Sequence, residues 1–189
     1  GSSFKIIPDS ELVYGPASAQ FDIDAFIQKQ GGYLANYTQD VNGEILTGTQ
    51  IVERVTQDYS VNPRLLLALL EYKSQWVTGT APANLDYPLG FYDYYHAGLY
   101  RQLAWAANTL NRGYYLWRAN ALSTLSLSDG TYVLLSPTIN AGTAGLQYFL
   151  AQFSSRAVWD LDVSQFGFLL TYNLLFGNPF DIQIANLIP

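Results

Sequence analysis

The carboxylates are the first candidates for chemistry in this sequence, because it has no cysteine and a single histidine, His96. A thiol nucleophile, a thiolate metal site and any site that needs two imidazoles are therefore excluded. Glu71 is distinctive among the carboxylates because it directly follows an all-apolar run, Leu65 to Leu70. A carboxylic acid in apolar surroundings can act as a general acid near neutral pH. We therefore take Glu71 as the candidate proton donor, with Asp93 as an alternative.

A loop rich in aromatic residues, 82–94, supplies further candidates. Asp86 and Asp93 lie in this loop, and either could act as the second carboxylate of an inverting glycosidase. The other reading is that they are turn formers, as aspartates in loops commonly are. Aromatic rings above a cleft can stack on sugars, whereas buried rings belong to the core. Six rings could either stack on sugar or belong to the core: Trp76, Tyr87, Phe91, Tyr92, Tyr94 and Trp105.

A central helix is expected to position Glu71. Asn62 followed by Pro63 is typical of a helix start, with an Asn cap and Pro in the first turn. The apolar run that follows predicts a helix buried on every side, whose polar end at 71–75 meets solvent or a cleft. At about 100° per residue, Glu71 and Lys73 lie roughly 200° apart, so a regular helix cannot direct both into one cleft.

The remaining pattern predicts a mainly α fold with little β structure. Residues 1–20 are expected to form an extended arm, with Gly1-Ser2-Ser3 as a cloning remnant. Residues 21–189 are expected to form one domain. The other predicted elements are helices at 21–30, 48–59, 99–115 and 139–153, a last helix capped by Asp162 and ending at Phe176, a turn-rich segment at 40–48 and a short strand at 132–135.

Composition limits the partners and the cofactors. Nine Lys and Arg against fifteen Asp and Glu give a net charge of −6 without a basic stripe, so nucleic acid is not expected as a partner. No apolar run approaches the roughly 18 to 20 residues of a membrane span, so membrane insertion is not expected. An aromatic content of 15% with 13% charged residues suits a sugar-binding cleft or a tyrosine-rich core. We expect no metal and no cofactor.

The segment Ser60 to Trp76, SVNPRLLLALLEYKSQW, resembles the signature of soluble lytic transglycosylases, which are relatives of goose-type lysozyme. Three further blocks are similar to family blocks and follow in the same order: 98–103, 140–150 and 171–177. The resemblance covers 60–178 and leaves 1–45 outside. It implies a lysozyme-like fold, with several helices around one buried helix, and cleavage of the β-1,4 glycan backbone of peptidoglycan.

The sequence departs from this family at the residue that matters most, because Lys73 stands where the family has its catalytic Glu. A lysine is a poor substitute for the acid, whereas near a helix C-terminus it has an ordinary role opposite the helix dipole. The resemblance places Lys73, Ser74, Gln102, Tyr172 and Asn173 among the expected substrate contacts, and Tyr92 of the aromatic loop is a further expected contact.

Two functions therefore stay open. The first is a peptidoglycan-cleaving enzyme that acts between N-acetylmuramic acid and N-acetylglucosamine, with Glu71 or a loop aspartate as its acid. The alternative is an inactive domain that binds glycan or serves as a scaffold in a larger cell-wall protein. An enzyme requires a carboxyl group in an apolar cleft beside Tyr172. Either function implies an exported protein, in the periplasm, on the cell surface or outside the cell, with peptidoglycan or a related polysaccharide as its partner and an oligomeric state left open.

Overall fold

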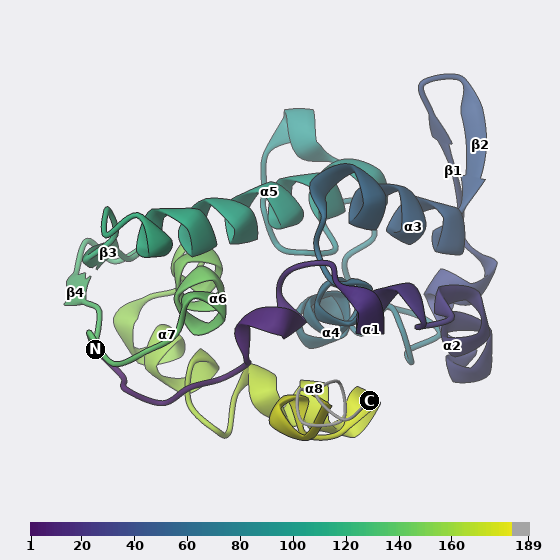
Figure 1. Cartoon of the computed structure of the whole chain (residues 1–189). Helices are drawn as coiled ribbons and strands as arrows, with labels where there is room; N and C mark the ends of the chain where they lie inside the picture. Colours follow the sequence, from purple (N-terminus) through teal and green to yellow (C-terminus); the bar gives the residue numbers. More distant parts are fainter. Residues whose placement is uncertain (183–189) are drawn as a thin grey trace. The chain divides into compact units, whose positions relative to one another are not determined.

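The computed structural model describes residues 1–182, and within them the predicted mainly α fold is confirmed (Figure 1). The β structure consists of two hairpins, β1 (Thr38–Val41) with β2 (Glu44–Thr47) and β3 (Thr124–Ser126) with β4 (Tyr132–Leu134). The helices are α1 Pro16–Ala19, α2 Ile23–Gln30, α3 Gly48–Tyr59, α4 Pro63–Ser74, α5 Leu99–Arg118, α6 Ala141–Ala151, α7 Arg156–Asp162 and α8 Phe168–Phe176, with short 3-10 helices η1 Asp9–Glu11, η2 Tyr33–Asn36 and η3 Tyr94–His96.

The chain divides into two compact units. Unit 2 is the continuous segment 14–107, and unit 1 combines residues 1–13 with the chain from 108 onward. Helix α5 contributes to both units, because the division falls within it. This division does not test the predicted single domain over 21–189, which stays a prediction and whose last residues, 183–189, lie outside the described part.

The core of unit 2 is α4, the buried helix that the sequence predicts. Asn62 caps it by accepting a hydrogen bond of 2.9 Å from the amide of Arg64, and Pro63 occupies the first turn. Every residue from 63 to 70 is buried, so the apolar run packs against neighbours on all sides. The helix ends at Gln75, which adopts a left-handed conformation with φ 59°.

The helices before α4 also begin where the sequence places their signals. The carboxylate of Asp22 caps α2 through the amide of Ala25, and Thr47 and Gln50 form both hydrogen bonds of a capping box at α3. The prediction was wrong for 40–48, because residues 38–47 pair as the hairpin β1–β2. Asn42 and Gly43 both have positive φ, 54° and 89°, which is the geometry of a tight hairpin turn.

The core of unit 1 contains a second buried helix, α6, in which Tyr148 is the one residue not buried. The N-terminal segment runs along this helix. The amide of Ile6 donates to Thr143 Oγ1 at 2.9 Å, and Asn140 Nδ2 donates to the carbonyl of Ile7 at 2.7 Å. Asp9 Oδ1 accepts a hydrogen bond of 2.8 Å from the amide of Gly142, so this carboxylate caps the first turn of α6.

The last predicted helix, capped by Asp162 and ending at Phe176, differs from the structure, so this prediction was wrong. Residues 156–176 form two helices, α7 and α8, instead of one helix capped by Asp162. Asp162 is the last residue of α7, and its buried carboxylate accepts a hydrogen bond of 2.9 Å from Ser154. Gly177 ends α8 as expected. None of the described helices combines the length and the hydropathy needed to cross a bilayer.

Candidate functional site: a tyrosine pocket beside a braced loop

Glu71, the predicted acid, lies at the half-buried end of α4 and organises the chain that follows. Its Oε1 accepts hydrogen bonds from the amides of Val77 and Thr78 at 3.1 and 3.0 Å, and its Oε2 accepts one from Thr78 Oγ1. The left-handed residue Gln75 reverses the chain and brings these amides back to the helix end. The carboxylate therefore fixes the turn after α4.

This turn forms one side of a pocket. The amides of Tyr33 and Leu34 donate to the carbonyls of Gly79 and Trp76 at 2.7 and 3.0 Å, so the start of η2 pairs with the segment after α4. A Cβ on Gly32 would lie 2.2 Å from the carbonyl oxygen of Val77, so only glycine permits this close approach.

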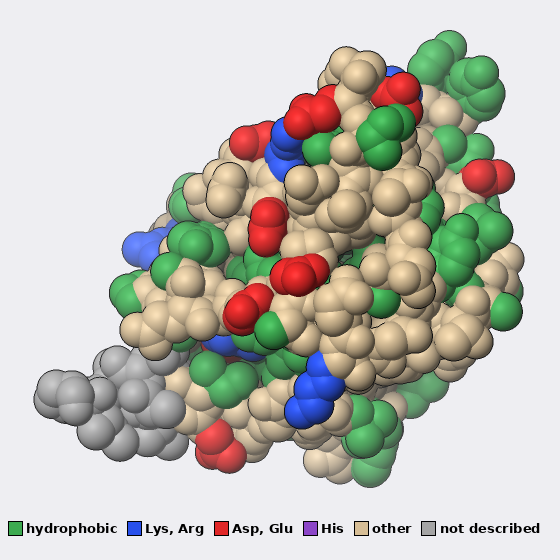
Figure 2. Space-filling view, turned by 90° about the vertical axis from the view of Figure 1, so that its right-hand side faces the viewer, with side chains coloured by type: hydrophobic (Ala, Val, Ile, Leu, Met, Phe, Trp, Pro, Cys, Tyr) green, Lys and Arg blue, Asp and Glu red, His purple; other side chains and the backbone are tan. Residues whose placement is uncertain are grey.

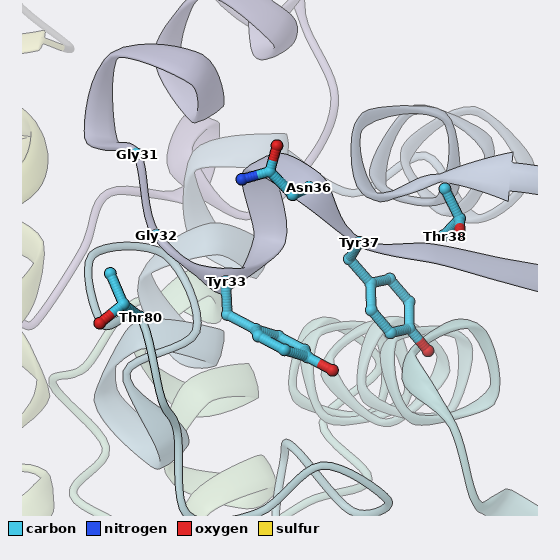
Figure 3. A pocket seen from close by; sticks show the side chains of 7 residues that line it. All are labelled: Gly31, Gly32, Tyr33, Asn36, Tyr37, Thr38 and Thr80. Atoms are coloured by element: carbon cyan, nitrogen blue, oxygen red, sulfur yellow. The ribbon is translucent and has the colours of Figure 1, made fainter.

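The pocket, which we call the tyrosine pocket, has a volume of about 370 Å³. The rings of Tyr33 and Tyr37 contact the buried Trp76 edge-on, with ring centroids 4.7 and 4.9 Å away. Figure 3 shows the two tyrosine rings pointing in the same direction, while the Asn36 amide points the opposite way and Thr80 approaches from the other segment. The lining residues are Gly31, Gly32, Tyr33, Asn36, Tyr37, Thr38 and Thr80.

The lining carries hydrogen-bonding groups without charge. An amide, two threonine hydroxyls and two phenols supply donors and acceptors, and the lining contains no Asp, Glu, Lys, Arg or His. Burial raises the pKa of Tyr37, and the negative charge of Asp86 acts in the same direction. The phenol donates to Gln39 Oε1 at 3.3 Å. Tyr37 is therefore a neutral hydrogen-bonding group across the physiological pH range.

The aromatic loop at 84–96, which we call the tyrosine loop, is braced from α5 by Gln102. This fully buried side chain donates from Nε2 to the carbonyls of Phe91 and His96 at 2.9 and 2.8 Å, and its Oε1 accepts from the amide of Leu89 at 3.2 Å. Gln102, one of the predicted substrate contacts, thus fixes three points of the loop backbone.

The outer face of the tyrosine loop presents phenol side chains. Tyr92, Tyr94 and Tyr95 are 76%, 82% and 73% exposed. In the same loop, Phe91 stacks on Trp105 of α5 with ring centroids 4.1 Å apart and an angle of 7° between the ring planes. The loop therefore carries both exposed rings and a ring that packs on α5.

Two of the predicted site residues in this loop have partners within it. Asp93, the alternative acid, pairs with His96 Nδ1, and the hydroxyl of Tyr92 accepts a hydrogen bond of 3.0 Å from Asn84 Nδ2. The tyrosine pocket is joined to the start of α5 through Gln39, whose Oε1 accepts from both the Tyr37 hydroxyl and the amide of Tyr100.

The residues that follow Glu71 in α4 make local contacts. The ammonium of Lys73 lies 6.0 Å from the centroid of the Tyr72 ring, and Ser74 Oγ donates to the carbonyl of Leu70 at 3.1 Å. The second contact is the usual back-bond of a serine within a helix.

Tyr172 and Asn173 belong to unit 1, on α8. Tyr172 is fully buried and its hydroxyl donates to the buried carboxylate of Glu11, while Asn173 is exposed. The sequence argument requires a carboxyl group in an apolar cleft beside Tyr172. The carboxyl group that contacts Tyr172 is that of Glu11, from the expected arm, and neither residue faces a cleft because both are fully buried. Glu11 was missed because the arm gives no periodic signal that would place it in a core.

The residues of the tyrosine pocket were also missed. The available signal is a Gly-Gly pair, 31–32, followed by two tyrosines four positions apart, Tyr33 and Tyr37. Paired glycines mark a close backbone approach or a turn, and aromatic residues next to them indicate a wall that another molecule can touch.

Comparison with known proteins overturns the resemblance to lytic transglycosylases. The model of one family, described as LasA, N-terminal domain, matches residues 5–186. No curated protein and no solved structure matches the chain. The lysozyme-like fold and the two peptidoglycan-directed functions derived from the resemblance are therefore wrong, because this family belongs to a staphylolytic protease and not to a transglycosylase. With nearly its whole length matched, the chain belongs to the LasA N-terminal domain family.

Proposed function

We propose that the chain is a non-catalytic accessory domain of a LasA-type protease, and that its tyrosine pocket and tyrosine loop bind a peptide segment of the protease in the same polypeptide. The observation that carries this proposal is the family match over residues 5–186, because it assigns the chain to the N-terminal part of a protease family. A domain in that position has the protease as a neighbour in the same polypeptide.

The chemistry of the tyrosine pocket supports a peptide as the ligand. Its uncharged lining offers donors and acceptors for backbone amides, and the rings of Tyr33 and Tyr37 offer apolar faces for small uncharged side chains. The volume of about 370 Å³ suits a few residues of an extended chain.

The tyrosine loop supports binding because it is already ordered. Gln102 fixes its backbone, so little conformational entropy is lost when a partner binds. Tyrosine adds a large contact area with few rotatable bonds, which is why binding surfaces use it often. The engagement of Glu71 and Asp93 in local hydrogen bonds supports a binding role over a catalytic one.

The test is calorimetric titration of this chain with the separately purified protease domain of its polypeptide. We expect micromolar or tighter binding, and a loss of at least about tenfold in affinity on Tyr33→Ala or Tyr94→Ala, since aromatic anchors dominate interface energetics. Tyr132→Ala is the matched control, because Tyr132 is exposed on β4 in unit 1. No binding, equal losses in all three variants, or binding to glycan strands in place of the protease would overturn the proposal.

We also propose that the chain acts outside the cytoplasm. The proteins of the LasA family are secreted, which supports the export expected from the sequence. Fractionation of the native producing cells would test this, and recovery of the protein in the cytoplasmic fraction alone would contradict it.

A further inference from the structure

A second pocket of unit 2, separate from the tyrosine pocket in its lining residues, lies among α1, the start of α2 and α3. Its volume is about 210 Å³, which is small for a whole ligand and suits a single side chain. We call it the acidic pocket. Its lining residues are Tyr14, Ser18, Ala19, Phe21, Asp22, Ile23, Glu53, Thr56 and Gln57.

The charge of this lining is negative. Asp22 and Glu53 are its ionisable acids, and the lining contains no Lys, Arg or His. Asp22 uses Oδ1 to cap α2, and within the described residues its Oδ2 and the whole carboxylate of Glu53 accept no hydrogen bond. Figure 2 shows the face of the molecule that carries α2, α3 and the hairpin β1–β2, and acidic side chains gather in the middle of this face.

A buried hydroxyl in the wall is the second, independent observation. Thr56 is 1% exposed, and its Oγ1 has no hydrogen-bond partner in the described part of the chain. Buried hydroxyls are nearly always hydrogen-bonded, so the unpaired hydroxyl in the pocket wall calls for a partner from outside the described residues. A water molecule would satisfy Thr56 but would bring no positive charge to the two carboxylates.

The aromatic side of the acidic pocket also suits a cation. Phe21 already has a cation above its ring, since the guanidinium carbon of Arg64 lies 5.6 Å from the ring centroid. Arg64 is buried and has partners of its own, including the carbonyl of Ala17 at 3.5 Å. Its single charge leaves the pair of carboxylates with a net negative charge. Tyr14 adds an exposed ring at the rim.

From these observations we infer that the acidic pocket binds the ammonium group of a lysine side chain presented by a peptide partner. An ammonium carries three donors, and the lining residues Asp22, Glu53 and Thr56 carry oxygens that can accept hydrogen bonds. The aliphatic stem of the lysine would lie against Phe21 and Tyr14. The site goes beyond the proposed function, because none of its lining residues belongs to the tyrosine pocket or the tyrosine loop.

The test is an NMR titration of the ¹⁵N-labelled chain with Nα-acetyl-lysine-N-methylamide. We expect saturable shifts of the Thr56 and Gln57 amide signals in the millimolar range, which weaken as salt is added. The norleucine analogue, which lacks the ammonium, should leave these signals in place. Equal shifts with both probes, or no shift with either, would overturn the inference.

Three variants separate binding from folding. Glu53→Gln and Asp22→Asn remove a charge, and the second keeps the cap of α2 because Asn caps as well as Asp. Each should weaken lysine binding about fivefold. Thr56→Val removes the unpaired hydroxyl, so it should leave thermal stability equal or higher while weakening binding.

Asp58→Asn is the matched control, because it makes the same charge change on α3 outside the pocket lining. It should leave the affinity unchanged. Binding that survives Glu53→Gln, or that falls as much in Asp58→Asn as in Glu53→Gln, would show that no specific ammonium site exists.

Discussion

At the scale of single residues, Glu71 has a structural task that a substitution can measure. Glu71→Gln keeps the shape of the side chain but removes the negative charge that the amides of Val77 and Thr78 share, and it replaces the oxygen that accepts from the Thr78 hydroxyl with an NH2 group. We expect a loss of about 1–2 kcal/mol in the free energy of unfolding, since the lost bonds are charge-assisted. Urea unfolding measures it.

The control for this substitution is Asp58→Asn, an exposed carboxylate on α3. It should change stability by less than about 0.5 kcal/mol, as surface substitutions usually do. If Glu71→Gln costs no more than this control, Glu71 does not hold the turn after α4.

Asp129 predicts a pH dependence. Its carboxylate accepts hydrogen bonds from the amide of Arg156 at the start of α7 and from Thr131, and these bonds lower its pKa from 3.8 to about 2. Because the folded state has the lower pKa, the carboxylate stabilises the fold above pH 3.8, and this contribution is lost as the pH falls through about 2.

Asp129→Asn should therefore melt at a lower temperature than the parent chain at neutral pH. The difference in melting temperature should narrow as the pH falls from 3.8 to about 2, the interval between the two pKa values. Thermal melts across this interval measure the difference. A difference that stays constant at all pH values would contradict the role given to the carboxylate.

The sequence was informative for residues that cap their own helix and uninformative for residues that act on a distant segment. Asn62 and Thr47 bond within a few positions, so their roles follow from spacing. The partners of Glu71 are set by the left-handed turn at Gln75, and glutamine gives no signal for that conformation. Asp9 and Asp129 cap helices that lie 133 and 27 positions away.

At the scale of elements, the tyrosine loop depends on one buried side chain of α5. Gln102→Leu would leave the amide of Leu89 and the carbonyls of Phe91 and His96 without their partner. We expect a loss of about 3 kcal/mol in stability, together with faster amide exchange at 84–98. Hydrogen exchange with mass spectrometry measures amide protection in the loop separately from that in the rest of the chain. Unchanged protection at 84–98 would contradict the claim that Gln102 holds the loop backbone in place.

Helix α6 offers the opposite case, a buried polar side chain without a partner. Gln147 is fully buried, and both polar atoms of its side chain lack hydrogen bonds in the described residues. Gln147→Leu should therefore raise the free energy of unfolding by about 1 kcal/mol or more. The carbonyl of Gln147, which accepts from Trp159 Nε1 at 3.0 Å, is kept.

The matched control is Gln152→Leu, at the exposed end of the same helix, which should give no gain. A decrease in stability on Gln147→Leu would indicate that Gln147 has a partner, such as an ordered water, that this substitution removes.

Element prediction failed where a local pattern had a second explanation. Asp162 and Gln165 have the spacing of a capping box, yet Asp162 pairs with Ser154 at the end of α7. Asn42-Gly43 is a strong hairpin signal, and it was lost among the other turn-forming residues around it. A buried helix with a polar end is common to many folds, so it could not decide between families.

At the scale of the whole molecule, unit 1 is assembled from the two ends of the chain. Removing residues 1–13 would delete the fully buried Ile6, Ile7 and Leu12 and the carboxylate of Asp9 that caps α6. We expect amide protection to be lost across α6, α7 and α8, while α2, α3 and α4 in unit 2 keep theirs. Equal loss in both units would show that they unfold as one.

This arrangement has a consequence for the order of events on the ribosome. Residues 1–13 leave the ribosome before unit 2, yet α6, the helix they run along, is made more than a hundred residues later. Unit 2, a continuous stretch of chain, has all its contacts available earlier. The apolar side chains of Ile6, Ile7 and Leu12 therefore stay exposed until α6 has been made, and exposed apolar side chains make a nascent chain prone to aggregation. Synthesis therefore sets an order of folding, in which unit 2 can fold first and unit 1 can fold only after the segment from residue 108 onward has been made.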